Sequence, residues 1–311
     1  MSFKAFTLPA FAKINWTLRV LGRRADGYHE LHTIFQTVTL SDRLTFTPSD
    51  DSDITFDCDA PDVPHDESNL VVRAARALRE RYRVTRGAAI SLEKRIPSAA
   101  GLGGGSSDAA VALLGLARLW RLEPQQRELE ELGADLGADV PFFFTGGTAL
   151  GTGLGTEIEP LADAPATPLL IIKPPVQVST AEAYKALNAP ALTKVGGDII
   201  LSSSRPHTQI PDSLPDNLRN DFEPVIYGLH SEILRAAEAL KQAGARAALL
   251  AGSGASVFGV FDDLESRVRA AQALRAETAW RLYECETLSR ASYLEELGAC
   301  ARPLRRTHPG V

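Results

Sequence analysis

Residues 97–110 read Pro97-Ser98-Ala99-Ala100-Gly101-Leu102-Gly103-Gly104-Gly105-Ser106-Ser107-Asp108-Ala109-Ala110. The four glycines open backbone dihedral angles that other residues avoid, and they let N–H groups approach a ligand without a Cβ in the way. Apolar residues then recur at helical spacing up to residue 120, so a helix begins where the glycines end, with Ser106 or Ser107 as its N-cap and Asp108 in its first turn. Free N–H groups at a helix N-terminus favour phosphate. The stretch therefore predicts a phosphate-binding loop, and the alternative is a plain glycine-rich turn between a strand and a helix.

The two standard phosphate fingerprints do not fit this loop. A P-loop needs a lysine after its last glycine, and the stretch has none. The dinucleotide-binding fingerprint needs a third glycine where this loop has Ser106 or a later residue. Phosphate binding here must follow another pattern.

Bulk composition sets limits on the class of protein. A chain of 311 residues exceeds the comfortable size of one core, so two domains are expected. The net charge of -6 argues against nucleic acid as a partner, and the basic end with Arg302, Arg305 and Arg306 is expected to be a solvated tail. The three cysteines are far apart, and no apolar run is long enough to span a bilayer. We expect a cytoplasmic protein without a membrane partner.

The first ordered element is predicted to be a half-buried strand. Residues 10–20 alternate, with apolar side chains at even positions and Lys13 and Asn15 together on the polar face. A breaker cluster at residues 22–27 follows, and residues 28–40 form a second extended run. The two runs predict an antiparallel hairpin.

Further along, the pattern predicts alternating helices and strands in two units. The first unit has a helix around residues 70–78, a strand at 88–96, a helix from Pro124 to Leu136 and a glycine-studded strand, and residues 160–168 look like a linker. The second unit begins with a strand at 169–172 and a helix with a capping box at Ser179. It continues with an insertion at 189–216, one helix from about 225 to 243, two strands at 247–251 and 256–261 around Gly252-Ser253-Gly254, and a last helix and strand.

Asp139 is the candidate general base. It lies between a helix end and the apolar run Val140-Pro141-Phe142-Phe143-Phe144, where a carboxylate is unfavourable unless a cation compensates it. Lys13 is the natural cation. The alternatives are a carboxylate in a helix C-terminal turn and an exposed lysine on an edge strand.

Five segments in this order resemble the GHMP kinases, a superfamily of small-molecule phosphotransferases. Within it they are most similar to the family of 4-diphosphocytidyl-2-C-methyl-D-erythritol kinases, and the segment at 24–31 is the most specific of them. The five segments are residues 9–15, residues 24–31 (Arg-Ala-Asp-Gly-Tyr-His-Glu-Leu), residues 101–110, residues 137–142 and Gly252-Ser253-Gly254. Two positions depart from the family pattern, Ala99 and Trp16, and we expect them to alter only local conformation and packing.

The resemblance implies an α/β (α+β) fold with two domains. An N-terminal mixed-sheet domain at 1–162 would carry Lys13, the glycine-rich phosphate loop and Asp139, a C-terminal α/β sandwich domain would span 168–290, and residues 291–311 would be a tail. It implies ATP-dependent phosphorylation of the 2-hydroxyl of a cytidine-diphosphate-linked sugar alcohol, with Mg²⁺, in the non-mevalonate route to isoprenoid precursors. Lys13 and Asp139 would be catalytic, and the enzyme would be a monomer or a homodimer.

The resemblance also implies which residues bind ligands. Tyr28 would stack on cytosine, His29 would hydrogen-bond it, Tyr184 would be a second stacking partner and Asn15 would hold the erythritol part. Asn69 would contact adenine, and Ser107 or Ser106 would contact Mg²⁺. The remaining residues of the set would bind ATP through the loop: Gly101, Leu102, Gly103, Gly104, Gly105, Ser106 and Ser107. On the residues alone, Tyr184 is equally a helix core residue and Asn69 an N-cap, whereas a metal site at His29, Glu30 and His32 is disfavoured because alternation places neighbours on opposite faces.

Two other functions stay open at this level. One is another GHMP kinase, acting on homoserine, mevalonate or a sugar. The other is a non-catalytic nucleotide-binding regulator, for which we expect loss of Lys13 or Asp139, and the chain has both.

Overall fold

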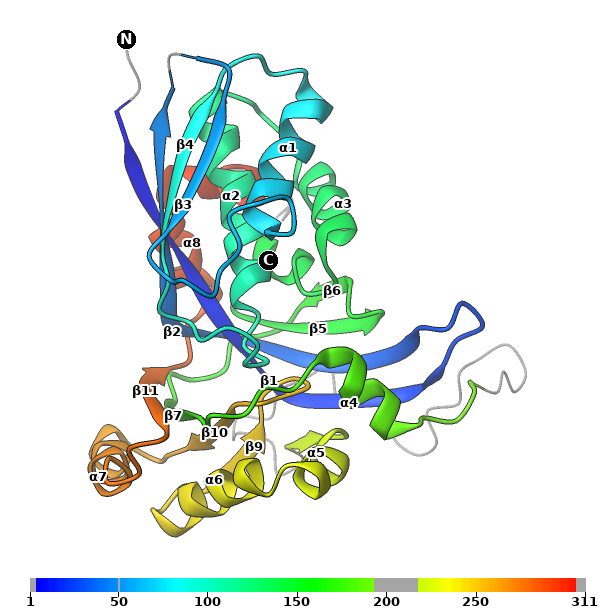
Figure 1. Ribbon diagram of the computed structural model, residues 1–311, viewed down its shortest axis with the longest axis vertical. Helices are drawn as coiled ribbons and strands as arrows, with labels where there is room; N and C mark the ends of the chain where they lie inside the picture. Colours follow the sequence, from blue (N-terminus) through cyan, green and yellow to red (C-terminus); the bar gives the residue numbers. More distant parts are fainter. Residues whose placement is uncertain (1–3, 50, 193–217, 306–311) are drawn as a thin grey trace.

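The computed structural model describes residues 4–49, 51–192 and 218–305, which form two sheets with helices on their outer sides (Figure 1). The expected insertion at 189–216 lies mostly outside these residues. In the described residues, no helix is long and apolar enough to cross a membrane.

The first sheet has seven strands and is built around the long hairpin of β1 (Phe6–Arg23) and β2 (His29–Pro48). One half of β2 pairs with β4 (Ala88–Glu93), which pairs in parallel with β3 (Ile54–Cys58). The other half of β2 pairs with β5 (Thr148–Gly153), which pairs with β6 (Glu157–Pro160). The short strand β8 (Arg219–Asn220) adds to β1 in parallel. The predicted antiparallel hairpin is confirmed.

The second sheet has four antiparallel strands in the order β11 (Arg281–Glu286), β7 (Pro168–Lys173), β10 (Val257–Val260) and β9 (Ala247–Leu250). The helices of this half lie below the sheet in Figure 1: α5 (Glu223–Leu229), α6 (Ser231–Gln242) and α7 (Leu264–Leu274), with α4 (Thr180–Leu187) beside the hairpin. The strands predicted at 169–172, 247–251 and 256–261 are confirmed within a residue or two.

The two sheets pack face to face, so the molecule has layers of helices, sheet, sheet and helices. Alternate residues of β1, among them Ile14 and Trp16, share a core with Leu169 and Phe258 of the second sheet. On its other side the first sheet packs against α1 (Leu70–Tyr82), α2 (Gly104–Trp120) and α3 (Gln126–Leu136). The expectation that β1 is half-buried is wrong for residues 10–16, where both faces are covered and Lys13 is 3% and Asn15 1% exposed, whereas Arg19 further along is exposed.

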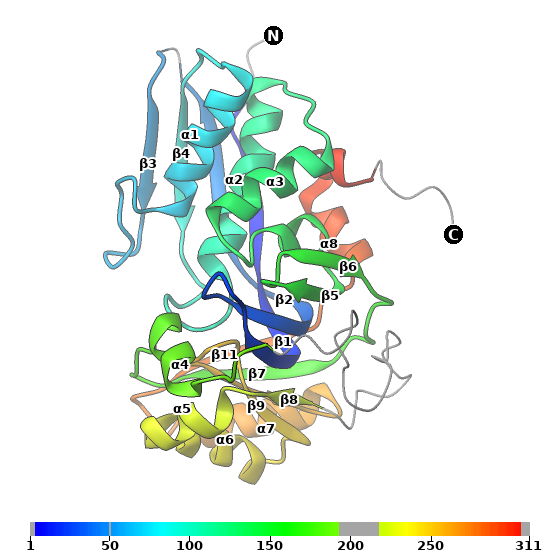
Figure 2. The same cartoon turned by 90° about the vertical axis from the view of Figure 1, so that its right-hand side faces the viewer.

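Two predicted segments differ from the structure. The helix expected over 225–243 is two helices, α5 and α6, which meet at His230, where the backbone is extended (φ -131°, ψ 85°). The expected solvated tail is wrong for the residues described. There the chain forms α8 (Arg290–Leu297) and two 3₁₀ turns, η2 (Gly298–Ala301) and η3 (Pro303–Arg305), and returns to the first domain (Figure 2).

The returning segment is part of the core of the first domain. Tyr293 and Leu297 are fully buried, and the Tyr293 hydroxyl donates to the Phe143 carbonyl at 2.5 Å. Phe143 belongs to the 3₁₀ helix η1 (Pro141–Phe144), which begins two residues after Asp139. The first domain is therefore made of both ends of the chain, and the second domain is inserted between them.

Candidate active site

A cavity of about 580 Å³ opens where the two domains meet. Its walls come from β1 and β2, the start of α1, the glycine loop, α4 and the loop between β9 and β10. Most of the predicted site residues line it: Lys13, Asn15, Asn69, Gly101, Leu102, Gly103, Gly104, Gly105, Ser106, Asp139 and Tyr184. The sequence motifs that lie far apart along the chain thus converge on one cavity.

Lys13 and Asp139 form an ion pair inside this cavity. The distance from Lys13 Nζ to Asp139 Oδ2 is 3.2 Å, and the lysine side chain is 4% exposed against 34% for the aspartate. Lys13 Nζ also donates to Asn15 Oδ1 at 3.0 Å, and Asn15 Nδ2 donates to Thr33 Oγ1 at 2.7 Å. The ammonium is held on several sides, while the carboxylate keeps an open side toward the cavity.

The aromatic side chains behind this pair come from η1 and β2. Phe142 stacks on Phe35, with ring centroids 4.9 Å apart, and Lys13 Nζ lies 5.5 Å from the Phe35 centroid. A Cβ added to Gly103 would lie 3.1 Å from Phe143 and 3.0 Å from Lys13. The 3₁₀ helix after Asp139 thus backs both the lysine and the glycine loop.

The glycine loop of residues 97–103 is fixed against the second domain. A Cβ added to Gly101, whose φ is +75°, would lie 1.9 Å from the Ala251 carbonyl oxygen, so only glycine fits there. The Ser256 N–H donates to the Ala100 carbonyl at 3.2 Å. The loop is therefore shaped by contacts across the domain boundary as well as by its own sequence.

The start of α2 differs from the prediction. The helix begins at Gly104 with Gly103 as its N-cap, so neither serine caps it and Asp108 lies beyond the first turn. Ser106 lines the cavity, whereas Ser107 is fully buried outside the lining and its hydroxyl has no partner among the described residues. Of the two serines considered for a metal ion, only Ser106 lines the cavity.

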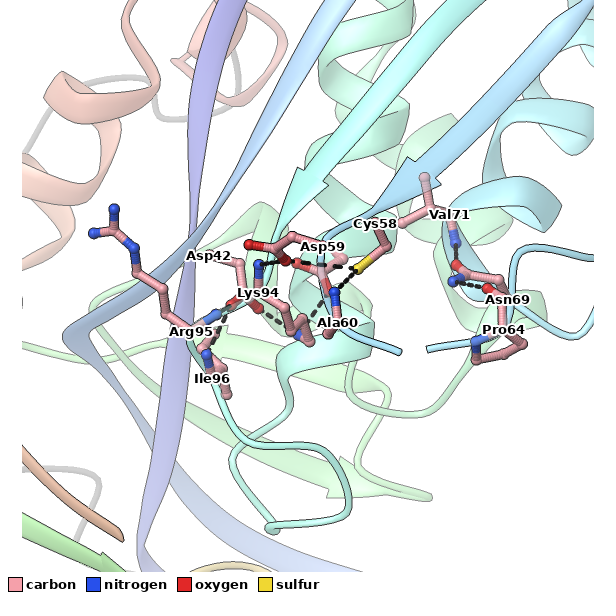
Figure 3. Close-up of polar contacts among 11 residues, drawn as sticks. Asp42, Cys58, Asp59, Ala60, Pro64, Asn69, Val71, Lys94, Arg95 and Ile96 are labelled. Carbon is pink, nitrogen blue, oxygen red and sulfur yellow. Dashed lines mark hydrogen bonds and ion pairs between the residues drawn. The ribbon is translucent and has the colours of Figure 1, made fainter. Parts of the chain in front are cut away.

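A buried charge cluster lies beside the loop (Figure 3). Lys94 Nζ pairs with a carboxylate oxygen of Asp42 and with Asp108 Oδ2, the latter at 2.9 Å. Asp42 Oδ1 also accepts from the backbone N–H groups of Arg95 and Ile96. The cluster joins β2, the segment after β4 and α2, and so fixes the direction in which the glycine loop leaves the sheet.

The cluster holds two carboxylates and one ammonium group. Burial raises the pKa of Asp108 to about 7; the Lys94 charge lowers that pKa in part, and the Asp42 carboxylate raises it further. Burial alone would lower the pKa of Lys94, but the two carboxylates raise it overall. The pKa values of both Asp108 and Lys94 are therefore raised within the cluster.

Asn69 is confirmed as an N-cap, and its contact with adenine stays a prediction. It is the N-cap of α1, where its Oδ1 accepts from the Val71 N–H at 2.8 Å, and its Nδ2 donates to the Pro64 carbonyl at 2.8 Å (Figure 3). It also lines the cavity together with Pro64 and Leu70. Both polar atoms of the Asn69 side chain are used in hydrogen bonds that hold this wall of the cavity in shape. A ligand at this wall would therefore also contact the neighbouring residues Pro64 and Leu70.

The aromatic end of the site is formed by the hairpin tip and α4. His29 stacks on Tyr184 with centroids 4.7 Å apart, and Tyr184 packs edge-on against Phe222 at 4.9 Å. Burial, followed by the charge of Asp139, raises the pKa of Tyr184 to about 12. Tyr28 and His29 do not line the cavity, and Tyr28 is 64% exposed. The structure therefore joins His29 to Tyr184 and leaves Tyr28 in solvent at the edge of the site.

Several residues of the site were not predicted. Lys94, Thr33, Phe35, Thr180 and Phe222 all line the cavity. Strand alternation places Thr33 and Phe35 on the same face of β2. Only the register of the hairpin shows that this face is the one that carries Lys13 on β1, and the sequence does not give that register. Lys94 comes directly after β4, and no periodic pattern in the sequence predicts that its side chain is buried in the site.

Comparison with protein families gives two matches along the chain. The description "GHMP kinases N terminal domain" matches residues 69–147, and "GHMP kinases C terminal" matches residues 206–279. The first match contains Asn69, the glycine loop and Asp139, and the second contains the Gly252-Ser253-Gly254 loop.

Relatives in other organisms are similar over most of the chain. The 4-diphosphocytidyl-2-C-methyl-D-erythritol kinase of Solibacter usitatus is 42% identical over 280 residues, which cover 88% of this chain and 87% of the relative. The kinase of the same name from Pelotomaculum thermopropionicum is 44% identical over 260 residues, covering 84% and 90%.

Solved structures of GHMP kinases are similar to this chain as well. A 4-(cytidine 5'-diphospho)-2C-methyl-D-erythritol kinase superposes with a TM-score of 0.76 at 36% identity, covering 91% of this chain and 99% of that one. Homoserine kinase from Cytophaga hutchinsonii superposes with a TM-score of 0.68 at 20% identity, covering 93% and 97%, which shows a shared fold.

Proposed function

This chain belongs to the 4-diphosphocytidyl-2-C-methyl-D-erythritol kinases of the GHMP kinase superfamily, and on that premise we propose that it transfers the γ-phosphate of ATP to the 2-hydroxyl of 4-diphosphocytidyl-2-C-methyl-D-erythritol in isoprenoid precursor biosynthesis. The observation that carries the proposal is the 3.2 Å ion pair of Lys13 and Asp139 in the same cavity as the glycine loop. A base, a cation and a phosphate loop are the parts that phosphoryl transfer to an alcohol needs.

Asp139 is the general base of the proposed reaction. Its carboxylate is the more open member of the ion pair, so it can accept the proton of a substrate hydroxyl. Lys13 holds the carboxylate in place through the ion pair, and its positive charge stabilises the negative charge that develops on the attacking oxygen. Transfer is direct from ATP to the alcohol, and positioning with electrostatics supplies most of the rate.

The glycine loop and the start of α2 hold the phosphates of ATP. Gly103 and Gly104 leave the backbone N–H groups at the helix N-terminus open to the cavity, where the helix dipole favours negative charge. The adenine would lie toward Asn69 and Leu70 at the start of α1. Leu102, whose carbonyl accepts from the Lys13 N–H at 2.9 Å, keeps the loop and the catalytic strand in register.

The site also fits Mg²⁺ that arrives with the nucleotide. Magnesium is usually held by one or two protein ligands together with substrate phosphates, and the cavity offers the Ser106 hydroxyl and the Asp139 carboxylate. When bound, the ion neutralises charge on the phosphates. Ser107 is not part of this proposal, since its hydroxyl lies outside the cavity.

The cytidine end of the substrate belongs at the hairpin tip and α4. Tyr184 lines the cavity and presents an aromatic ring there, with His29 stacked on it and Tyr28 nearby in sequence. Aromatic rings bind a flat base by stacking, and a histidine adds hydrogen bonds to its edge. Asn15, beside Lys13, is the residue proposed to hold the methylerythritol part. A cytoplasmic location and a monomeric or homodimeric state stay predictions.

One assay tests the proposed function. ADP release from ATP and Mg²⁺ is measured with the cytidyl-methylerythritol substrate and, in parallel, with homoserine, mevalonate and a sugar. We expect turnover with the cytidyl substrate alone. Turnover of one of the other alcohols only would select another GHMP kinase activity, and no turnover of any would favour the non-catalytic regulator.

A further inference from the structure

We propose that Asn220 is a positioning residue for phosphoryl transfer: its side-chain amide fixes the backbone of Gly252 against Lys13 and the glycine loop. The inference rests on the proposed function, because it concerns the same site. Asn220 does not line the cavity, and none of the sequence motifs includes it.

The amide of Asn220 is buried and fully used. The residue is 3% exposed, its Nδ2 donates to the Leu250 carbonyl at 2.9 Å and to the Gly252 carbonyl at 2.6 Å, and its Oδ1 accepts from the Phe222 N–H at 2.9 Å. Only one orientation of the amide satisfies these partners, since carbonyls require the NH₂ side and the N–H requires the oxygen. An asparagine is therefore needed for its donors as well as for its size.

Gly252 connects the Asn220 amide to the proposed reacting groups, because its carbonyl accepts from that amide. A Cβ added there would lie 2.9 Å from the Gly101 carbonyl oxygen and 3.4 Å from Lys13 Nζ, so both groups border the space that a side chain at position 252 would take. Its φ of +54° is a conformation that L side chains rarely adopt. A displacement of the Gly252 carbonyl would therefore be transmitted to Lys13 and to the phosphate loop.

Asn220 is itself anchored to the strand that carries Lys13. It lies in β8, which pairs in parallel with β1 through Thr17 and Leu18. The neighbouring Asp221 adds two bonds to the same strand: its N–H donates to the Leu18 carbonyl and its Oδ2 accepts from the Val20 N–H, both at 2.9 Å. Strand β1 thus holds Lys13 directly and, through Asn220, the loop that packs against Lys13 from the other domain.

The same segment also reaches the aromatic end of the site. Phe222, whose N–H is held by Asn220, lines the cavity and packs edge-on against Tyr184. One side chain therefore sets the position of two walls of the cavity. Misplacing reacting groups by about 1 Å can cost on the order of 10²-fold in rate, which is why such a residue matters for turnover.

The test is Asn220→Asp, which keeps the shape of the side chain and removes the donors. In this variant an ionised carboxylate would face two carbonyl oxygens and repel them, so we expect kcat to fall about 10-fold or more at pH 8, with the KM for ATP within about twofold of wild type. A protonated carboxyl donates one hydrogen bond, so the ratio of variant to wild-type kcat should rise as the pH is lowered from about 8.5 to about 6. A role in packing alone would not give this pH profile.

The matched control is Gln272→Glu, which makes the same change of amide to carboxylate at an exposed position of α7 in the second domain. We expect it to keep the wild-type kcat at every pH. Asn220→Ser is the second variant, to be used if the aspartate variant does not fold. Its hydroxyl donates one hydrogen bond, so its kcat should be several-fold below that of wild type.

Three outcomes separate this inference from the proposed function. If wild type has no activity toward the cytidyl substrate, the proposed function fails. If wild type is active and either Asn220 variant matches its kcat, only the present inference is overturned. A reduced kcat for Asn220→Asp with a flat pH ratio, or a loss confined to the melting temperature, also overturns it.

Discussion

Lys13 Nζ lies 3.2 Å from Asp139 Oδ2, although the two residues are separated by most of the first domain along the chain. Lys13 comes from β1, which lies between β2 and β8 in the first sheet, and Asp139 from the turn between α3 and η1. In this pair the Lys13 ammonium group is buried and bonded to Asn15, whereas the Asp139 carboxylate stays open to the cavity. This asymmetry supports the proposal that Asp139 accepts the proton and that Lys13 acts electrostatically.

Asp139→Asn should lower kcat by ~10²-fold or more, the scale of a lost general base, because an amide cannot accept the substrate proton. Nucleotide affinity should change little, since the loop proposed to bind ATP is untouched. Steady-state kinetics with both substrates measure the two effects. Asp135→Asn, an exposed carboxylate of α3, is the matched control and should keep the wild-type rate. Near-normal turnover of Asp139→Asn would contradict the assignment.

Tyr28→Ala should weaken binding of the cytidyl substrate by ~1–3 kcal/mol, the range for loss of one base-stacking ring. The KM for ATP should stay unchanged. Because Tyr28 is 64% exposed, stability should not change either, and thermal unfolding checks this. If instead the KM for ATP rose, the two nucleotides would occupy opposite ends of the cavity from those proposed.

Gly101→Ala should destabilise the protein by more than ~2 kcal/mol, because the new Cβ meets the Ala251 carbonyl at 1.9 Å and φ is +75°. Gly105→Ala is the contrasting variant. Its Cβ would lie 3.8 Å from Leu70, and alanine is favoured over glycine in a helix by roughly 0.5–1 kcal/mol, so stability should be equal or higher. Urea unfolding of the two variants compares them directly, and equal stabilities would contradict the described contact.

Asp108→Asn should change how stability depends on pH. The pKa of Asp108 in the folded protein, about 7, lies above its ordinary value of 3.8, so between these values the folded state binds more protons than the unfolded state. Its contribution to stability is complete below the ordinary value and is lost as the pH rises through about 7. Asparagine has no such loss.

The measurement is the free energy of unfolding of both proteins at about pH 5 and about pH 8, on either side of the raised pKa. The asparagine variant should gain on wild type by on the order of 1–3 kcal/mol over this interval. Asp57→Asn, an exposed aspartate of β3, should follow wild type. A difference between Asp108→Asn and wild type that is the same at both pH values would refute the raised pKa.

The sequence predicted those parts of the candidate site that lie within short segments with a recognisable local pattern. The glycine loop, the hairpin with Lys13 and Asn15, and the turn with Asp139 each carry a local signature, and the family match at residues 69–147 covers the loop and the turn. The strands of the second sheet were found because short apolar runs between turn residues have few alternatives. The order of residues alone is therefore enough to place these segments.

The remaining features depend on contacts between distant parts of the chain. Nothing local distinguishes Asn220 from an ordinary turn asparagine until the Gly252 carbonyl is seen beside it. Lys94 looks like a surface lysine after a strand, and Asp108 like a first-turn carboxylate, until Asp42 closes the cluster. The break at His230 was missed because the apolar period continues through it.

The return of α8 to the first domain has a consequence for how the protein is made. Tyr293, Leu297 and Leu304 complete a core whose other members are largely synthesised before residue 150. The core of the first domain can therefore close only after residues 293–304 have been synthesised, and a nascent chain that stops after the second domain leaves that core open.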